Sequence, residues 1–192
     1  MTQAWKTGHS HSIRGEIGGI IMFILVIWIG FAADLMLPLE RFGLIPRRGA
    51  GLYGIFFMPF LHGSLGHIIS NTVPLFVLML LLAGSRPSSM IIVASVTFLS
   101  GLLLWFFGRP IIHIGASGLV FGLITFLIFY GLFEKRIISI IVSLLVGFLY
   151  GGSLFTGVMP GQTGISWDGH FCGAAAGIII AWLVTRKSIG SH

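Results

Sequence analysis

Six long apolar runs alternate with short polar breaks along the chain. Each run approaches the roughly 20 apolar residues that a helix needs to cross a bilayer. The breaks carry charges or turn residues, as in "PLERFGLIPRRG", "SRPS", "GRPIIHIGA" and "EKR". The pattern therefore predicts six membrane-spanning helices, over residues 17–36, 65–84, 89–107, 117–133, 137–155 and 169–185.

The composition favours the same class, an all-α polytopic membrane protein. Hydrophobic residues fill 56% of the 192 positions and charged residues only 8%, whereas a soluble domain carries about 25% charged residues. We expect an N-terminal cytoplasmic tail over residues 1–16, a six-helix membrane domain over 17–185 and a short C-terminal tail over 186–192. The first run is also compatible with a cleaved signal peptide, but no polar mature domain follows it.

The net charge of +6 comes from basic residues in the tails and breaks. This placement indicates membrane topology and anionic lipid headgroups as partners, and argues against nucleic acid. With the N-terminus inside, seven basic residues lie on the inner side and four on the outer side. The inner set is Lys6, Arg14, Arg86, Lys135, Arg136, Arg186 and Lys187, and the outer set is Arg41, Arg47, Arg48 and Arg109. The bias predicts that both termini are cytoplasmic, although the outer "PRR" group weakens it.

Polar residues recur at one depth in the predicted bundle. Spans two, four and six run in the same direction, so their first turns lie near one membrane face, the outer one in this orientation. His67 and Asn71 lie in the first turns of span two. Ser117 opens span four, and His170 opens span six. Each alone is explained as a helix cap, an interhelical hydrogen bond or an interfacial side chain. Together they favour a functional site.

Ser117 and His170 have the chemistry of a nucleophile and its base. A serine hydroxyl attacks a carbonyl when a neutral histidine takes its proton. Close packing of spans four and six is needed to bring the two residues together. We find no third member, because Asp168 lies two residues before His170, faces away from it on a regular helix, and is interpreted as the N-cap of span six.

The surroundings of Ser117 suit a developing negative charge. The start of a helix offers unpaired N–H groups and a favourable dipole for an oxyanion. His67 and Asn71 are four residues apart, hence on one helix face, and both can donate hydrogen bonds to it. Small residues flank the serine and allow a substrate backbone to approach: Gly115, Ala116 and Gly118.

Small residues also predict the close packing that the dyad requires. Gly173 and Gly177 form a G-x-x-x-G pattern in span six. Gly118 and Gly122 give span four a matching notch. Ordinary helix packing explains the same pattern. The two interpretations are compatible, because the dyad itself requires close packing of these helices.

The segments "HGSLGHIISN", "GASG" and "GHFCGAAAG", in this order on spans two, four and six, resemble the rhomboid intramembrane serine proteases. The resemblance covers the six-span core and implies the rhomboid fold. It implies that Ser117 is the nucleophile and His170 the general base. It further implies an oxyanion hole from His67, Asn71 and the Ser117 backbone N–H. The family cuts transmembrane segments of other proteins within or near the bilayer, without metal or cofactor.

The resemblance also assigns residues around the site. His62 matches an additional histidine before span two, which has a structural part in the family. Gly115 matches the glycine of the serine motif, with Gly118 directly after the serine. Gly173 and Gly177 match the packing glycines of span six.

Two positions depart from the family pattern. Many members carry Trp-Arg nine residues before the first histidine, where this chain has Tyr53 and Gly54. A tyrosine often lies four residues after the nucleophile and stacks on the catalytic histidine, whereas this chain has Phe121. Neither change removes a catalytic group, so they bear on substrate handling and rate rather than on reaction type.

Three other functions were weighed. An inactive relative that binds transmembrane helices without cutting them is the main alternative, but such proteins usually lack the serine or the histidine. A transporter or channel would use His67, Asn71 and His170 as an ion path, yet no charged residue lies in the interior of spans two to six. A metal hydrolase lacks the H-E-x-x-H motif. Its ligands would come from His62, His67, His113 and His170.

The sequence thus predicts an intramembrane serine endopeptidase with no cofactor and no metal. Its expected partners are transmembrane protein substrates and membrane lipids. We expect it in a bacterial inner membrane, with both termini cytoplasmic and the active site opening to the outer side.

Overall fold

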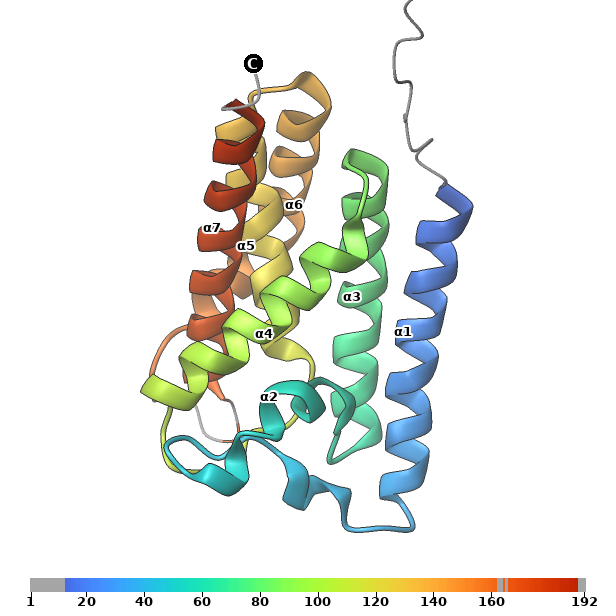
Figure 1. Ribbon diagram of the computed structural model, residues 1–192, viewed down its shortest axis with the longest axis vertical. Helices are drawn as coiled ribbons and strands as arrows, with labels where there is room; N and C mark the ends of the chain where they lie inside the picture. Colours follow the sequence, from blue (N-terminus) through green and yellow to red (C-terminus); the bar gives the residue numbers. More distant parts are fainter. Residues whose placement is uncertain (1–12, 162–163, 165, 190–192) are drawn as a thin grey trace, which may run out of the picture.

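The structure, a computed structural model, describes residues 13–161, 164 and 166–189, and this part of the chain consists of helices joined by turns and loops, without strands (Figure 1). Six helices are long and apolar enough to cross a membrane. They are α1 (Ile13–Asp34), α3 (Leu65–Ser85), α4 (Ser89–Phe107), α5 (Ser117–Glu134), α6 (Ile137–Gly157) and α7 (Trp167–Ile189). Each lies within four residues of a predicted span at both ends, so the six-helix prediction is confirmed.

The connection between α1 and α3 contains short helical turns that the sequence pattern did not predict. They are η1 (Leu39–Phe42), η2 (Gly49–Gly51), α2 (Gly54–Phe57) and η3 (Met58–Phe60). The connection begins early because α1 ends at Asp34, two residues before the predicted end of span one. The Asp34 carboxylate accepts the N–H groups of Leu39 at 2.7 Å and Glu40 at 3.2 Å, which turns the chain away from the helix.

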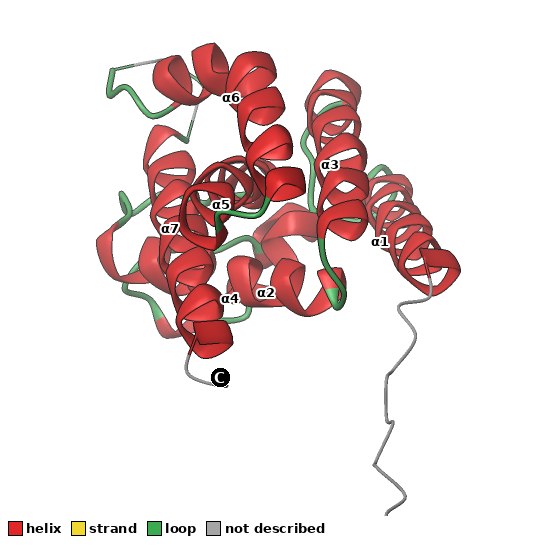
Figure 2. Cartoon of the chain, turned by 90° about the horizontal axis from the view of Figure 1, so that it is seen from above, coloured by secondary structure: helices red, strands yellow, loops and turns green. Residues whose placement is uncertain are grey.

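α5 is the central helix of the bundle. Buried residues make up 67% of its span, against 11% for α1 and 17% for α6. Its most extensive contact is with α7, followed by α6. Figure 2 shows it from above, enclosed by α4, α6 and α7. The helix that begins with Ser117 is therefore the best-anchored element of the molecule.

Glycines let α5 and α7 approach until their backbones touch. A Cβ atom at Gly173 would overlap the carbonyl oxygen of Gly118, and one at Gly177 would overlap that of Gly122. One turn further along, the Thr125 hydroxyl donates to the Ala174 carbonyl at 2.8 Å. The predicted close packing of spans four and six is confirmed.

The first helix is packed into the bundle rather than detached from it. α1 lies against α3, and its Ile20 and Ile27 are fully buried in the central apolar cluster. Residues 1–12 and 190–192 lie outside the described residues, so the predicted division into tails and membrane domain stays a prediction.

Candidate active site

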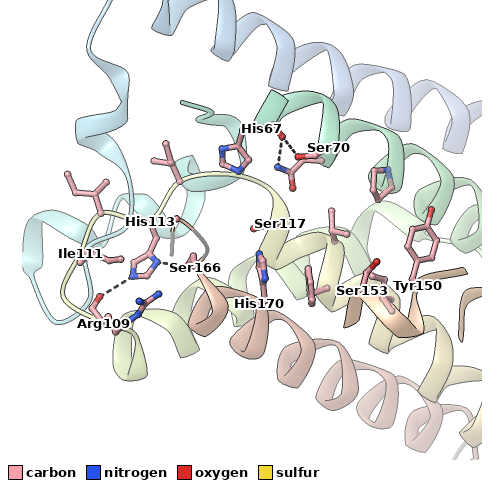
Figure 3. Close-up of a pocket in the computed structure, with 18 of the residues that line it drawn as sticks. His67, Ser70, Arg109, Ile111, His113, Ser117, Tyr150, Ser153, Ser166 and His170 are labelled. Atoms are coloured by element: carbon pink, nitrogen blue, oxygen red, sulfur yellow. Dashed lines mark hydrogen bonds between the residues drawn. The ribbon is translucent and has the colours of Figure 1, made fainter. Parts of the chain in front are cut away.

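A cavity of about 970 Å³ opens among α3, α5, α6, α7 and the loop that precedes α5 (Figure 3). Its wall contains five residues named for the predicted serine-protease site: His67, Asn71, Ser117, Phe121 and His170. They come from three helices and are brought together by the packing of α5 against its neighbours. The structure thus gathers the predicted site residues around one opening.

Ser117 is the first residue of α5, and Ala116 is its N-cap. The interpretation of Ser117 as a helix cap is therefore wrong, because the N-cap is the residue before it. Its side chain is half-buried on the cavity wall, and Figure 3 shows the His170 imidazole directed toward it. Because the first N–H groups of a helix lack intrahelical acceptors, the backbone at Ser117 has donors to offer.

Gly115 permits the turn that presents Ser117. Its φ of +104° lies in the region that side chains disfavour, and its N–H donates to the Met58 carbonyl at 2.9 Å. A Cβ atom here would lie 2.5 Å from Nε2 of His67. Glycine is thus required both by the backbone conformation and by the close approach of the His67 ring.

His62 supports the same turn from the other side. It is 1% exposed, and its Nε2 accepts the Ala116 N–H at 3.4 Å. Burial lowers the pKa of His62 to about 4, and the nearby His67 lowers it as well. The ring is therefore neutral near pH 7, as an accepting Nε2 requires. This contact fixes the residue directly before Ser117.

His67 and Asn71 lie on one face of α3, one turn apart, as their spacing predicted. Asn71 is nearly fully buried, and its Nδ2 donates to the main-chain carbonyl of His67 at 2.8 Å. An amide group has two N–H donors. One of them therefore remains for a group in the cavity.

The His170 side chain is oriented by two contacts, one with an aromatic ring and one with a main-chain carbonyl. Phe121 stacks on it, with ring centroids 4.0 Å apart and planes within 7°, as the resemblance to the rhomboid family implied for this position. Nδ1 of His170 lies 2.9 Å from the carbonyl oxygen of Gly157 at the end of α6. Since a carbonyl only accepts, Nδ1 carries the hydrogen and Nε2 keeps its lone pair. The sequence analysis missed Gly157, because a main-chain acceptor leaves no side-chain signal.

Asp168 does not have the role that its position suggested. It is the second residue of α7, so its interpretation as the N-cap is wrong. Its carboxylate accepts from the Arg109 backbone N–H at 2.8 Å and from the guanidinium at 2.9 and 3.2 Å. This bonding raises the pKa of the Arg109 guanidinium. The pair ties the loop before α5 to the start of α7, two residues from His170.

His113 belongs to the same link and is almost fully buried. Its Nε2 lies 3.0 Å from the Arg109 carbonyl oxygen, and its Nδ1 lies 2.7 Å from the Ser166 hydroxyl, which itself donates to the Asp168 carboxylate at 3.2 Å. Burial lowers the pKa of His113. Its backbone pairs with that of Leu44 through two hydrogen bonds, at 2.8 and 3.0 Å. Within the described residues, no three His, Cys, Asp or Glu side chains form a metal-binding group.

Comparison with known proteins gives the family. A family model, the Rhomboid domain, matches residues 49–187. The chain belongs to the rhomboid family. Members of this family are generally intramembrane serine proteases, and the six apolar helices make this rhomboid a multi-pass integral membrane protein.

Mycobacterial proteins resemble this rhomboid over most of its length. Uncharacterized proteins of Mycobacterium bovis and Mycobacterium tuberculosis are 38% identical to it over 186 residues, which cover 90% of this chain and 77% of theirs. An uncharacterized protein of Mycobacterium leprae is 37% identical over 194 residues, covering 94% of this chain and 76% of its own.

Of the two residues that the resemblance marked as departures in the loop before α3, Tyr53 and Gly54, the structure gives a packing reason for the second. A Cβ atom at Gly54 would overlap the backbone of Leu44. The chain approaches itself here, so no larger side chain fits in this arrangement. Tyr53 is exposed.

Proposed function

We propose that this rhomboid is an intramembrane serine endopeptidase that hydrolyses peptide bonds within or near transmembrane segments of other proteins. The observation that carries the proposal is the orientation of His170. Its Nδ1 is occupied by the Gly157 carbonyl, and its ring is directed toward Ser117. A neutral imidazole in this position has Nε2 free to act as the general base.

In the proposed reaction, Nε2 of His170 takes the hydroxyl proton while Oγ of Ser117 bonds to the scissile carbonyl carbon. The carbonyl π electrons move to the oxygen, which becomes the oxyanion. Collapse of this intermediate breaks the C–N bond, and the leaving amine takes the proton from His170. Water then attacks the acyl-enzyme by the same route, which releases the acid and regenerates the serine.

Three donors support the oxyanion in this proposal. The backbone N–H of Ser117 lies at the N-terminus of α5, where the helix dipole favours negative charge. Asn71 has a second amide hydrogen beside the one bound to His67. The third donor is the His67 ring, which approaches Gly115 on the same cavity wall. No step in the mechanism calls for a metal or cofactor.

We propose a bacterial inner membrane as the location, with both termini cytoplasmic and the cavity opening to the outer side. The bias of Lys and Arg supports this orientation. The basic residues on the outer side are partly accounted for by structure. The Arg47 guanidinium donates to the carbonyls of Phe106 at 3.2 Å and Gly108 at 2.8 Å, so it closes the C-terminal end of α4.

The proposal predicts that Ser117 is a reactive nucleophile. Purified protein is treated with a fluorophosphonate, and the modified residue is identified by mass spectrometry. We expect adducts on Ser117 that disappear in Ser117→Ala and His170→Ala. Ser70→Ala and Ser153→Ala are matched controls, since both serines line the same cavity and should leave labelling intact. Undiminished labelling in Ser117→Ala contradicts the assignment of Ser117 as the nucleophile, and absence of labelling from the wild type favours the inactive helix-binding relative.

A further inference from the structure

We infer that α6 supplies the third member of the catalytic group, and that Gly157 is the positioning residue whose main-chain carbonyl orients His170. The inference rests on the proposed protease function. Among the described residues, the partner that the structure gives the base is this main-chain carbonyl.

The hydrogen bond decides which nitrogen of His170 can act. With Nδ1–H bound to the Gly157 carbonyl at 2.9 Å, the proton-accepting lone pair is on Nε2. The nearest carboxylate on α7, that of Asp168, is engaged by Arg109 instead. A main-chain oxygen thus accepts the Nδ1–H hydrogen bond that an aspartate accepts in a Ser-His-Asp triad.

The end of a helix adds an electrostatic effect. Gly157 is the last residue of α6, where carbonyl groups lack intrahelical donors and the helix dipole is negative. His170 becomes positively charged when it takes the serine proton. The negative end of α6 stabilises that imidazolium, so the contact strengthens as the reaction proceeds.

Glycine is required at this position for the contact to form. A Cβ atom at residue 157 would lie 2.6 Å from Cε1 of Phe121 and 3.3 Å from Nδ1 of His170. Phe121 is buried in the central cluster and stacked on His170, so neither ring can yield without disturbing the other. Three other glycines of α6 have nothing within 4 Å of such an atom: Gly147, Gly151 and Gly152.

The contact also links the position of α6 to the state of the base. The buried residues of α6 are Ser139, Ser143 and Val146, all in its first half. Its second half contacts the central cluster through the partly buried Tyr150 and Leu154, and reaches His170 through Gly157. A displacement of this end removes the acceptor from Nδ1 and frees His170 to change tautomer.

The test compares Gly157→Ala with Gly152→Ala in the purified full chain, with cleavage of a fluorescent transmembrane peptide as the assay. We expect Gly157→Ala to lower kcat about 100-fold with little change in KM, as a misplaced catalytic group does. Gly152→Ala should stay within about twofold of the wild type. Wild-type kcat in Gly157→Ala overturns the inference.

Nitrogen NMR of histidine-labelled protein gives a second readout that does not depend on turnover. The His170 signals are assigned by their absence in His170→Ala. We expect the Nδ1–H tautomer in the wild type and in Gly152→Ala, and a shift toward Nε2–H in Gly157→Ala. A wild-type Nε2–H tautomer overturns the inference even if the peptide is cut and Gly157→Ala fails to fold. Failure of the protease function is recognised separately, as absence of both cleavage and Ser117 labelling in the wild type.

Discussion

At the scale of single residues, Asn71 and Ser70 offer a direct comparison. Both side chains donate to the main-chain carbonyl of His67, each at 2.8 Å, but only Asn71 has a second hydrogen to give. We expect Asn71→Ala to lower kcat about 100- to 1,000-fold through loss of one oxyanion donor. Ser70→Ala should change kcat little. Equal losses in the two variants would show that the effect arises from α3 itself rather than from the oxyanion.

His62 makes the stability of the fold depend on pH. Its pKa is about 4 in the folded protein and 6.5 ordinarily, so protonation favours the unfolded chain. The contribution is complete above about pH 6.5 and is lost as the pH falls toward 4, by up to about 3 kcal/mol. We expect His62→Gln to lose less Tm than the wild type between pH 7 and pH 4. Parallel Tm curves for the two proteins would contradict this.

The residues of the dyad were predictable because their side chains carry chemical signals at helix starts. Ser117 and His170 were proposed from residue type and position, and Phe121 from the resemblance to the family. Gly157 was not, since its contribution is a carbonyl that every residue has. The Arg109–Asp168 pair was missed because its partners are 59 positions apart and meet only after α5 and α7 pack.

At the scale of elements, the bond between Arg109 and Asp168 joins the loop before α5 to the start of α7. A matched ion pair exists elsewhere, since Arg136 contacts Glu134 at the same 2.9 Å but is 74% exposed, against 41% for Arg109. We expect Arg109→Gln to lower the free energy of unfolding by about 1–2 kcal/mol, with lower activity, because the less exposed Arg109 guanidinium makes two hydrogen bonds to the Asp168 carboxylate, whereas Arg136 makes one contact with Glu134. Arg136→Gln should cost less than about 1 kcal/mol. Equal losses in thermal unfolding would argue against a special role for the link.

The glycine contacts between α5 and α7 should be the most sensitive packing positions. Gly177→Ala places a methyl group on the Gly122 carbonyl and 2.5 Å or less from the Thr125 hydroxyl. We expect a loss of about 2 kcal/mol in unfolding free energy and reduced cleavage, because the helices must separate. Gly84→Ala in α3, with open space around it, is the control and should leave Tm unchanged. An unaltered Tm in Gly177→Ala would contradict the packing account.

The helices themselves were predictable from the sequence because a helix that crosses a bilayer needs a long apolar run. Six such runs in one chain fit few structures other than a bundle of membrane-spanning helices. The turns between α1 and α3 were not. Their backbone is set by contacts such as that between Gly54 and Leu44, which no local pattern encodes.

At the scale of the whole molecule, the start of α5, which lies on the cavity wall, and the α5–α6 turn are at opposite ends of the central helix (Figure 1). The proposed topology puts the cavity end outside the cell. In a Cys172→Ala background, we expect a membrane-impermeant maleimide to label Ala50→Cys, in the exposed η2 turn, in intact cells. Lys135→Cys, exposed in the α5–α6 turn, should react only after lysis. The reverse pattern would invert the orientation.

Two helix ends of opposite dipole sign, the N-terminus of α5 and the C-terminus of α6, meet at the cavity. The N-terminus of α5 presents donors beside Ser117, and the C-terminus of α6 presents an acceptor to His170. In the proposed reaction, the negative charge on the substrate and the positive charge on the base are each placed at the helix end that favours them.

The most direct test of this account is cleavage of a fluorescent transmembrane peptide by the purified protein, beside Ser117→Ala and His170→Ala. We expect the wild type to cut the peptide and both variants, folded as judged by Tm, to lose the activity. Cleavage that survives in either variant, or a wild type that cuts no transmembrane peptide and does not react with a fluorophosphonate, would contradict the proposed protease.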